Sequence, residues 1–306
     1  MAGYLRASFL ALTLALFMLP FFKSSLACPN TVTYWGQHDN AGSLKDICKT
    51  NNYEYVNIAY LKNYAGGSPT LDISYHCRDC SYIGAEIEYC QENGIKVLLS
   101  LGDPGSGTGT NASQLAQYLW NNFLGGESSD RPLGNAILDG IVFEDFNPGT
   151  VLKFDELAKE LKNYSTTDKN VYLAAFPPCH EGDYNLDSVI DTGLLDYVWV
   201  KFYDDACCEY ANNNAGILLN SWFRWTSRTG INLLFMGVPE SEKHASSGYI
   251  PPQVLINQVL PVIKSSLKYG GVLVWHNFSS DSYTPQIKDY TCKNVENILT
   301  WLGTAI

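Results

Sequence analysis

Residues 81–102 read "SYIGAEIEYCQENGIKVLLSLG" and contain the unit from which the fold can be predicted. Apolar residues recur at helical spacing in the first half, and Gly94 follows them in the position of a common helix stop. The residues after it, "IKVLLSLG", form a short apolar run typical of a strand that is buried on both faces. The stretch therefore predicts a helix followed directly by a strand of an internal sheet.

The same alternation recurs along the whole chain. Apolar runs rich in Val, Ile, Leu and Tyr occupy residues 31–36, 55–61, 95–102, 136–146, 170–176, 195–203, 231–237 and 271–276. Amphipathic stretches lie between them, among them residues 81–94, 112–126, 154–164 and 251–271. Eight strands alternating with helices over about 250 residues predict a single-domain (β/α)8 TIM barrel. A doubly wound open sheet is the rival, but residues 34–44, "YWGQHDNAGSL", lack the Gly-rich phosphate loop that would favour it.

The first residues have the pattern of a targeting segment. Arg6 precedes the apolar run "SFLALTLALFMLPFF", and the small residues Ser25 and Ala27 come before Cys28. This order is typical of a secretory signal peptide, and the run is shorter than the ~20 apolar residues that a membrane span needs. We expect a signal peptide over 1–27, a barrel over 28–306, and a secreted protein, either extracellular or vacuolar.

The charge of the chain excludes two classes of partner. Its formal net charge is −11, with 31 acidic residues against 20 basic ones. Such a protein repels nucleic acid and anionic membranes, so neither is expected to bind. Cys77 and Cys80 have the spacing of half a zinc site, but no second half is placed to match them. No metal and no cofactor are expected.

Nine cysteines in an exported chain predict disulfide bonds, and the odd number leaves one thiol over. Three sequons, at Asn111, Asn163 and Asn277, permit glycosylation after export.

The carboxyl-terminal ends of the predicted strands carry the candidate functional groups, because these ends form the functional face of such barrels. They include Tyr34 to Gln37, Tyr60, Asp103, Glu144 to Phe146, Phe176, Lys201 to Tyr203, and Trp275 to Asn277. Aromatic side chains beside hydrogen-bonding groups suit sugar rings. Each aromatic residue taken alone is more typical of core packing, and it is the set at one mouth of the barrel that favours a cleft.

With the strands placed, the chain resembles plant class III chitinases, the hevamine-like proteins of glycoside hydrolase family 18. Its markers are "YWGQ" at 34–37, "YVNIAYL" at 55–61, "GIKVLLSLG" at 94–102, "YLWNNFLGG" at 118–126, "RPLGNAILDGI" at 131–141, "LDYVWVKFY" at 195–203, "NSWFRWTS" at 220–227, "SGYIPPQVLINQVLP" at 247–261 and "YGGVLVW" at 269–275. The resemblance implies the disulfides Cys48–Cys90, Cys77–Cys80 and Cys179–Cys208. A Cys28–Cys292 pair would then leave Cys207 as the odd thiol.

The resemblance also implies a substrate-assisted mechanism, in which the fourth strand ends in the pattern Asp-x-x-Asp-x-Asp-x-Glu. The last Glu protonates the leaving oxygen, the sugar's own acetamide attacks, and the neighbouring Asp with a later Tyr orients that acetamide. Here Asp139 fills the first position, Val142 the second, Glu144 the third and Phe146 the fourth. Residues 142, 144 and 146 share the inward parity of the strand.

Phe146 cannot donate a proton, and losing a general acid removes a factor of roughly 10² to 10⁴ in rate. Glu144 lies about 6–7 Å deeper along the strand, and Asp145 has the outward parity. Glu144 and Lys201 both face the mouth of the barrel, and a structural ion pair between them is the alternative to a catalytic role for Glu144. The sequence therefore predicts a protein that is not an enzyme.

The predicted function is the lectin-like binding of glycans, with a role in plant defence. The ligand-binding candidates are Tyr34, Gln37, Glu144, Phe176, Lys201, Tyr203 and Trp275. One alternative is an inhibitor of microbial xylanases and other glycosidases, or a storage protein. A second alternative is a residual endochitinase that hydrolyses polymers of N-acetylglucosamine. The expected partner is an oligosaccharide or a secreted microbial glycosidase.

Overall fold

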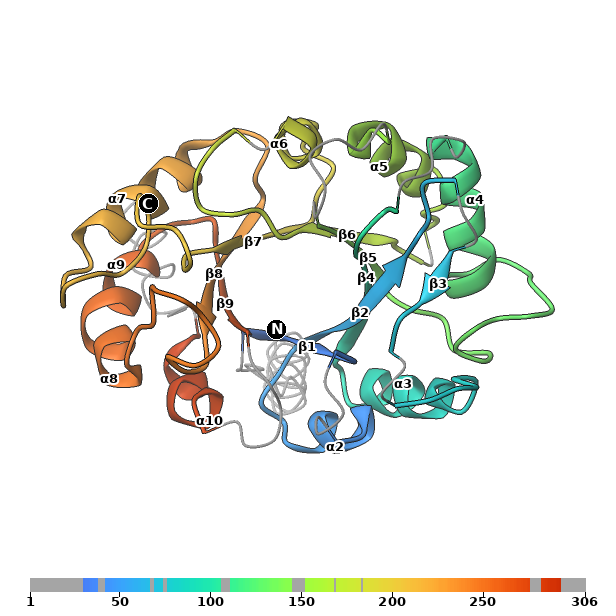
Figure 1. Ribbon diagram of the computed structural model, residues 1–306, viewed down its shortest axis with the longest axis horizontal. Helices are drawn as coiled ribbons and strands as arrows, with labels where there is room; N and C mark the ends of the chain where they lie inside the picture. Colours follow the sequence, from blue (N-terminus) through green and yellow to red (C-terminus); the bar gives the residue numbers. More distant parts are fainter. Residues whose placement is uncertain are drawn as a thin grey trace, which may run out of the picture.

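The predicted TIM barrel is confirmed. A computed structural model describes residues 30–37, 42–66, 69–73, 76–105, 111–144, 152–167, 169–182, 184–275 and 282–292. Parallel strands form a closed ring, and the pairing of β1 with both β2 and β9 completes it (Figure 1). The ring strands are β1 (Thr31–Trp35), β2 (Tyr55–Lys62), β4 (Lys96–Leu101), β5 (Gly140–Phe143), β6 (Tyr172–Ala175), β7 (Tyr197–Lys201), β8 (Leu233–Pro239) and β9 (Tyr269–Trp275). A short strand, β3 (Thr70–Leu71), pairs antiparallel with the end of β2.

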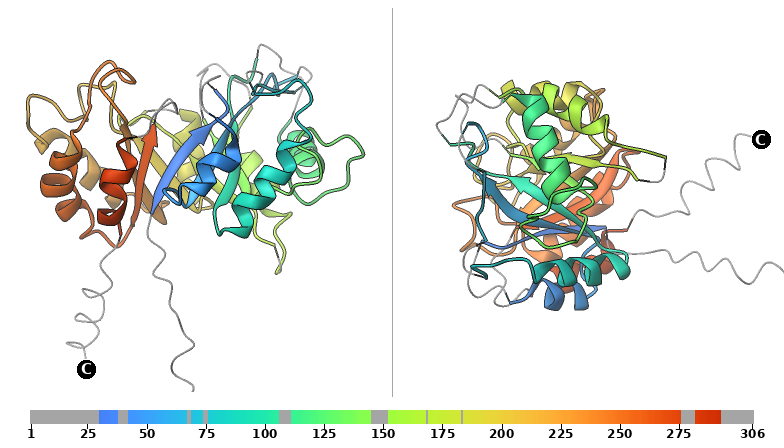
Figure 2. Two further views of the ribbon diagram at one scale, coloured as in Figure 1. Left: turned by 90° about the horizontal axis from the view of Figure 1, so that it is seen from below. Right: turned by 90° about the vertical axis from the view of Figure 1, so that its right-hand side faces the viewer.

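Helices surround the ring of strands, as two further views also show (Figure 2). They are α2 (Leu44–Lys49), α3 (Ile83–Glu92), α4 (Ala112–Phe123), α5 (Phe154–Lys162), α6 (Tyr184–Asp191), α7 (Gly216–Ser227), α8 (Pro252–Val254), α9 (Leu260–Ile263) and α10 (Thr284–Ile287). A π-helical turn, Leu255–Val259, joins α8 to α9, and a 3-10 turn, Lys288–Tyr290, follows α10. None of the helices in the described part of the chain is long and apolar enough to cross a membrane.

Helix α4 illustrates how local sequence fixes an element. Asn111 accepts a hydrogen bond from the backbone N–H of Gln114, and the Gln114 side chain accepts one from the backbone N–H of Asn111. This capping box satisfies two of the N–H groups that a helix start leaves without intrahelical partners. The buried face is then formed by residues at the three- and four-residue spacing of a helix: Ala112, Leu115, Ala116, Leu119 and Phe123.

Two predicted elements are shorter than the sequence suggested. Strand β5 (Gly140–Phe143) begins at Gly140 and not at residue 136, because the backbone N–H of Leu138 is already bonded to the end of α4 at Phe123. The helix expected over 251–271 runs only from 252 to 263 and contains the π-helical turn. Pro261 lacks a backbone N–H, so the ordinary i to i−4 bond cannot form there.

The registers of neighbouring strands sort the inward side chains into layers of four, each taken from alternate strands. The lower layer contains Val32, Leu98, Ala174 and Phe235, and the inward side chains of Tyr55 and Tyr197 lie beneath it. The central layer contains Asn57, Val142, Trp199 and Leu273. The upper layer contains Tyr34, Ser100, Phe176 and Gly237. The outer layer, nearest the carboxyl-terminal ends of the strands, contains Ala59, Glu144, Lys201 and Trp275.

The structure contains the three disulfides that the resemblance implied, Cys48–Cys90, Cys77–Cys80 and Cys179–Cys208. Cys207 is an exposed free thiol, as expected. Cys292 is also disulfide-bonded, while its predicted partner Cys28 lies outside the described residues.

The remaining predictions of modification and export stay predictions. Asn111 and Asn163 are exposed, and Asn277 lies outside the described residues, as does the predicted signal peptide over 1–27.

Candidate functional site

Glu144 is the buried carboxyl at the functional end of the barrel. It follows the last residue of β5, its side chain is inward, and only 5% of the residue is exposed. The Ser100 hydroxyl, on neighbouring β4, donates a short hydrogen bond to its Oε1. Burial raises the pKa of Glu144 to about 7, against the lowering effects of the Ser100 and Tyr34 hydroxyls and the charge of Lys201. A large share of these carboxyls is therefore protonated near neutral pH.

Three buried tyrosines surround this carboxyl. Tyr34 comes from β1, Tyr60 from β2, and Tyr203 follows β7. Burial, and then the negative charge of Glu144, raises the pKa of Tyr34 and of Tyr60. The pKa of Tyr203 is raised by burial first, then by Asp204 and Glu144. All three phenols remain protonated at physiological pH and can donate hydrogen bonds.

Aromatic rings continue from this cluster toward the end of β9. The ring centroids of Tyr34 and Trp275 are 5.1 Å apart in an edge-to-face arrangement. Phe176 lies 5.6 Å from Tyr34 and 6.2 Å from Trp275. Phe176 and Trp275 are partly exposed, so the side of this group away from the core is apolar and accessible. Such rings can contact the C–H faces of a sugar.

Lys201 does not pair with Glu144, and this prediction is wrong. Its Nζ lies 3.1 Å from Asp204 Oδ2 and 4.8 Å from the centre of the Tyr203 ring. Both members of the Lys201–Asp204 pair retain partial exposure. A pair at the surface keeps some hydration, whereas burying the ammonium beside Glu144 would cost its full desolvation.

Two further predicted residues take part in the scaffold. The Gln37 amide nitrogen donates to the carbonyl oxygens of Ala59, at 2.8 Å, and Asp72, at 3.2 Å. Gln37 thus ties the end of β1 to that of β2. Asp139 lies at the opposite end of β5, where its Oδ2 accepts hydrogen bonds from Gln91 Nε2 and from the backbone N–H of Val97, both 2.8 Å long.

The motif predicted to end the fourth strand is only partly described. Val142 is fully buried inside the barrel and Glu144 is placed as above. Asp145 and Phe146, the latter at the family's acid position, lie outside the described residues. Sequence reasoning missed Ser100, which sits within the apolar run "KVLLSL". Its alternation with Leu98 could have identified it as an inward hydroxyl.

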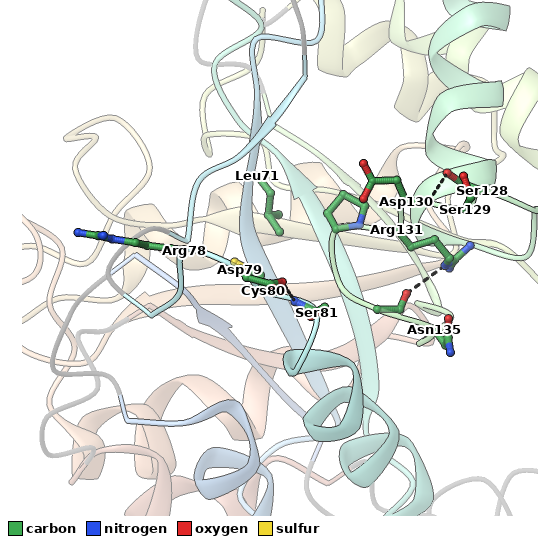
Figure 3. Close-up of a pocket in the computed structure, with 12 residues that line it drawn as sticks. Leu71, Arg78, Asp79, Cys80, Ser81, Ser128, Ser129, Asp130, Arg131 and Asn135 are labelled. Atoms are coloured by element: carbon green, nitrogen blue, oxygen red, sulfur yellow. Dashed lines mark hydrogen bonds between the residues drawn. The ribbon is translucent and has the colours of Figure 1, made fainter.

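The described residues also form a cavity of about 510 Å³ that involves none of this cluster. Two loops, 78–81 and 128–135, line it with mainly polar side chains (Figure 3). Arg131 at its wall is fully engaged, because its guanidinium donates to the backbone carbonyls of Asn121, Leu124, Gly126, Gly134 and Ala136. We therefore assign the polar loops a structural role and place the functional site at Glu144.

One group of potential metal ligands, Cys179, Asp205 and Cys208, occurs in the described part of the chain. The two cysteines are joined in a disulfide, so neither offers a thiolate. This group does not fit a metal ion.

Comparison with known proteins places the chain among the glycosyl hydrolases. Residues 30–249 match the profile of "Glycosyl hydrolases family 18". A protein named "Acidic endochitinase" from Cicer arietinum is 48% identical over 278 residues, which cover 87% of this chain and 93% of that protein.

Three solved structures extend the comparison. The ICChI chitinase from Ipomoea carnea is 41% identical with a TM-score of 0.77, covering 85% of this chain and 99% of that one. A xylanase-alpha-amylase inhibitor protein in complex with trehalose is 36% identical, with a TM-score of 0.73, over 87% and 97% of the two chains. The tamarind chitinase-like lectin is also 36% identical, with a TM-score of 0.75, over 85% and 99%.

The expectation that the chain is not an enzyme is contradicted by these relatives. Five curated relatives, 40–48% identical to it, are named acidic endochitinases. The expectation depended on the missing proton donor at Phe146. It set Glu144 aside because of its depth on the strand, and it did not foresee that burial raises the pKa of Glu144 to about 7, which leaves a protonated carboxyl at the same end of the barrel.

Proposed function

Because the chain belongs to glycosyl hydrolases family 18, we propose that it binds and hydrolyses polymers of N-acetylglucosamine at the carboxyl-terminal end of the barrel. The observation that carries the proposal is Glu144, a buried carboxyl in the outer layer with its pKa raised to about 7. Titratable groups perturbed in this way gather at functional sites. The names of the endochitinase relatives support the same substrate class.

In this proposal Glu144 supplies the proton that the leaving oxygen requires. Because it lies about 6–7 Å deeper on the strand than the family's acid position at Phe146, the sugar has to bind correspondingly deeper in the mouth of the barrel. A general acid works best when its pKa lies near the working pH, and the raised pKa of Glu144 meets that condition. The Tyr60 and Tyr203 phenols, both protonated, donate hydrogen bonds to the acetamide of the sugar. Phe176 and Trp275 contact the faces of the sugar rings. Gln37 positions the end of β1 and does not contact the sugar through its nitrogen.

The proposal is tested by incubating the protein with N-acetylglucosamine oligomers at pH values from 4 to 9 and measuring the products by chromatography. Activity is expected below pH 7 and should fall as the pH rises through about 7, because the protonated form of Glu144 is the active one. Glu144→Gln should lower kcat by roughly 10² to 10⁴. Glu54→Gln is the control, since Glu54 is a half-buried carboxyl whose pKa is also raised by burial but which lies at the amino-terminal end of β2. No turnover in the unmodified protein would overturn the proposal.

Binding to a microbial glycosidase is a second candidate function. It is favoured by the match to a xylanase-alpha-amylase inhibitor protein over 87% of this chain. Gel filtration of the chain with a fungal xylanase and with an α-amylase tests it. A stable complex that lowers the hydrolase activity would support inhibition, and separate elution with full activity would reject it.

We also propose export, with cleavage after Ala27. Mass spectrometry of the protein from its native tissue should then find Cys28 as the first residue. One relative is named an amyloplastic endochitinase, and an intact or differently cut amino terminus would point to such a route.

A further inference from the structure

The centre of the barrel contains polar groups that the protein itself does not satisfy. Asn57 and Trp199 are fully buried, and Tyr34 is 3% exposed. Among the residues that the structure describes, no hydrogen-bond partner reaches Asn57 Oδ1, Asn57 Nδ2, Trp199 Nε1 or the Tyr34 hydroxyl. Buried donors and acceptors are nearly always paired with protein or with ordered water, so this group requires an explanation.

These unpaired groups are neighbours in the layered interior. Asn57 on β2 and Trp199 on β7 belong to the central layer, and their strands stand on opposite sides of the ring. The other two members of that layer, Val142 and Leu273, are apolar and cannot pair with either. Tyr34 belongs to the upper layer and is the register partner of Asn57 on the adjacent strand.

The side chains that hold Trp199 prevent a simple rearrangement. Its ring stacks on Tyr197, with centroids 6.2 Å apart, and meets Tyr55 and Phe235 at 6.4 Å each. The indole offers a donor and no acceptor, whereas the Asn57 amide offers both. If the Asn57 oxygen took the indole N–H directly, the amide nitrogen would still lack an acceptor.

We infer that a buried water molecule binds at the centre of the barrel, held by the Asn57 amide, the Trp199 indole N–H and the Tyr34 hydroxyl. One water can accept from two of these donors and donate to the Asn57 oxygen and the Tyr34 oxygen. Internal waters typically have two to four such partners in a polar, enclosed place.

The bound water connects the core to the functional carboxyl. The Tyr34 hydroxyl lies close enough to Glu144 to lower the pKa of the carboxyl. Within the described part of the chain, the other titratable groups facing Glu144 are Tyr60, Lys201 and Tyr203. A water below Tyr34 orients its hydroxyl toward Glu144 and so favours the ionised carboxylate. This role concerns the ionisation of Glu144 and is independent of any reaction on a glycan.

A crystal structure at near-atomic resolution tests the site directly. We expect density for one water within hydrogen-bond distance of Asn57 and Trp199 in the unmodified protein. The density for the water should be absent in Asn57→Leu. It should be displaced in Trp199→Phe, a second variant that tests the site even if Asn57→Leu does not fold. Leu273→Met is the control, because it changes the same layer by a volume-conserving apolar swap and should keep the water.

Titration of Glu144 by carbon-13 NMR, with its signal assigned through Glu144→Gln, tests the connection. The midpoint should move upward by about one pH unit in Asn57→Leu and stay in place in Leu273→Met. A direct Asn57–Trp199 hydrogen bond with no water in the crystal would overturn the site. An unchanged Glu144 midpoint in Asn57→Leu would overturn its effect on the carboxyl. Neither result depends on whether glycan hydrolysis is observed.

Discussion

At the residue scale, the behaviour of the site depends on how Glu144 is solvated. The carboxyl is removed from water, and the Ser100 hydroxyl is the hydrogen-bond donor aligned on it among the described residues. Burial dominates over this bond, which is why the pKa is raised to about 7 despite the donor. Two consequences can be measured without knowing the ligand.

The first concerns stability. The folded-state pKa of Glu144, about 7, lies above the ordinary 4.5, so the unfolded chain ionises more readily. The contribution of Glu144 to stability is therefore greatest below pH 4.5 and declines until the pH passes about 7, by about 3 kcal/mol at most. Urea unfolding of the unmodified protein and of Glu144→Gln at pH 5 and pH 8 measures it. The difference between the two proteins should change with pH; a constant difference would contradict the assignment.

The second concerns Ser100→Ala. The Ser100 hydrogen bond favours the ionised carboxylate, so its removal should raise the pKa of Glu144 further. The NMR midpoint, and the alkaline limb of any glycan hydrolysis, should move upward by up to about one pH unit. Ser221→Ala is the control, because Ser221 is equally buried but bonds to the Cys179 carbonyl. A downward shift in Ser100→Ala would show that the contact has the opposite effect.

At the element scale, much of the fold could be predicted from the sequence, because strands and helices have distinct apolar periods. The runs at 55–61 and 95–102 became β2 and β4 with ends displaced by at most one residue. The late start of β5, at Gly140, follows from the tertiary hydrogen bond between Leu138 and Phe123, which the local pattern does not contain. The interruption of the helix near Pro261 has a local cause that the apolar spacing alone does not show.

Arg131 is the residue that organises the loop after α4. Its guanidinium donates to five backbone carbonyls, which a lysine ammonium cannot reach in the same geometry. Arg131→Lys should therefore destabilise the protein by about 2–4 kcal/mol in urea unfolding, since several partly buried carbonyls lose their partners. Arg78→Lys is the control, because Arg78 also lines the cavity but is exposed. This substitution should change the free energy of unfolding by less than about 0.5 kcal/mol. Equal effects of the two variants would rule out this role for Arg131.

At the scale of the whole molecule, the candidate site is a product of barrel closure. Tyr34, Glu144, Lys201 and Trp275 are far apart in the sequence, and only the strand registers bring them to one end. The rule that functional groups lie at the carboxyl-terminal ends of barrel strands could predict that set, but it could not predict which charged side chains form ion pairs. Lys201 pairs with Asp204 near the surface, where its ammonium keeps some hydration. The inward or outward direction of a side chain can be predicted from the strand pattern, but how deeply its charge is buried cannot.

Closure also limits what a strand can carry. A Cβ at Gly140 would lie 1.9 Å from the Tyr172 carbonyl oxygen, a backbone atom of the next strand. Gly140→Ala should therefore separate β5 from β6 and destabilise the barrel by about 3 kcal/mol or more, measured by thermal unfolding. Gly216→Ala is the comparison, since this residue begins α7 and its nearest contact is a side chain. It should be neutral or slightly stabilising. An unchanged Tm for Gly140→Ala would mean that the strands can shift apart at little cost.

The residue that caps α4, Asn111, is also a predicted glycosylation site. Asn111 uses its side-chain oxygen to hold the backbone N–H of Gln114 at 2.9 Å, and it is exposed. N-linked glycans attach to the side-chain nitrogen, which the cap does not use. A sugar chain at Asn111 could thus be added after the helix has folded, and removing it enzymatically would leave the helix start intact. Replacing the asparagine to abolish the sugar would instead remove both the attachment point and the cap.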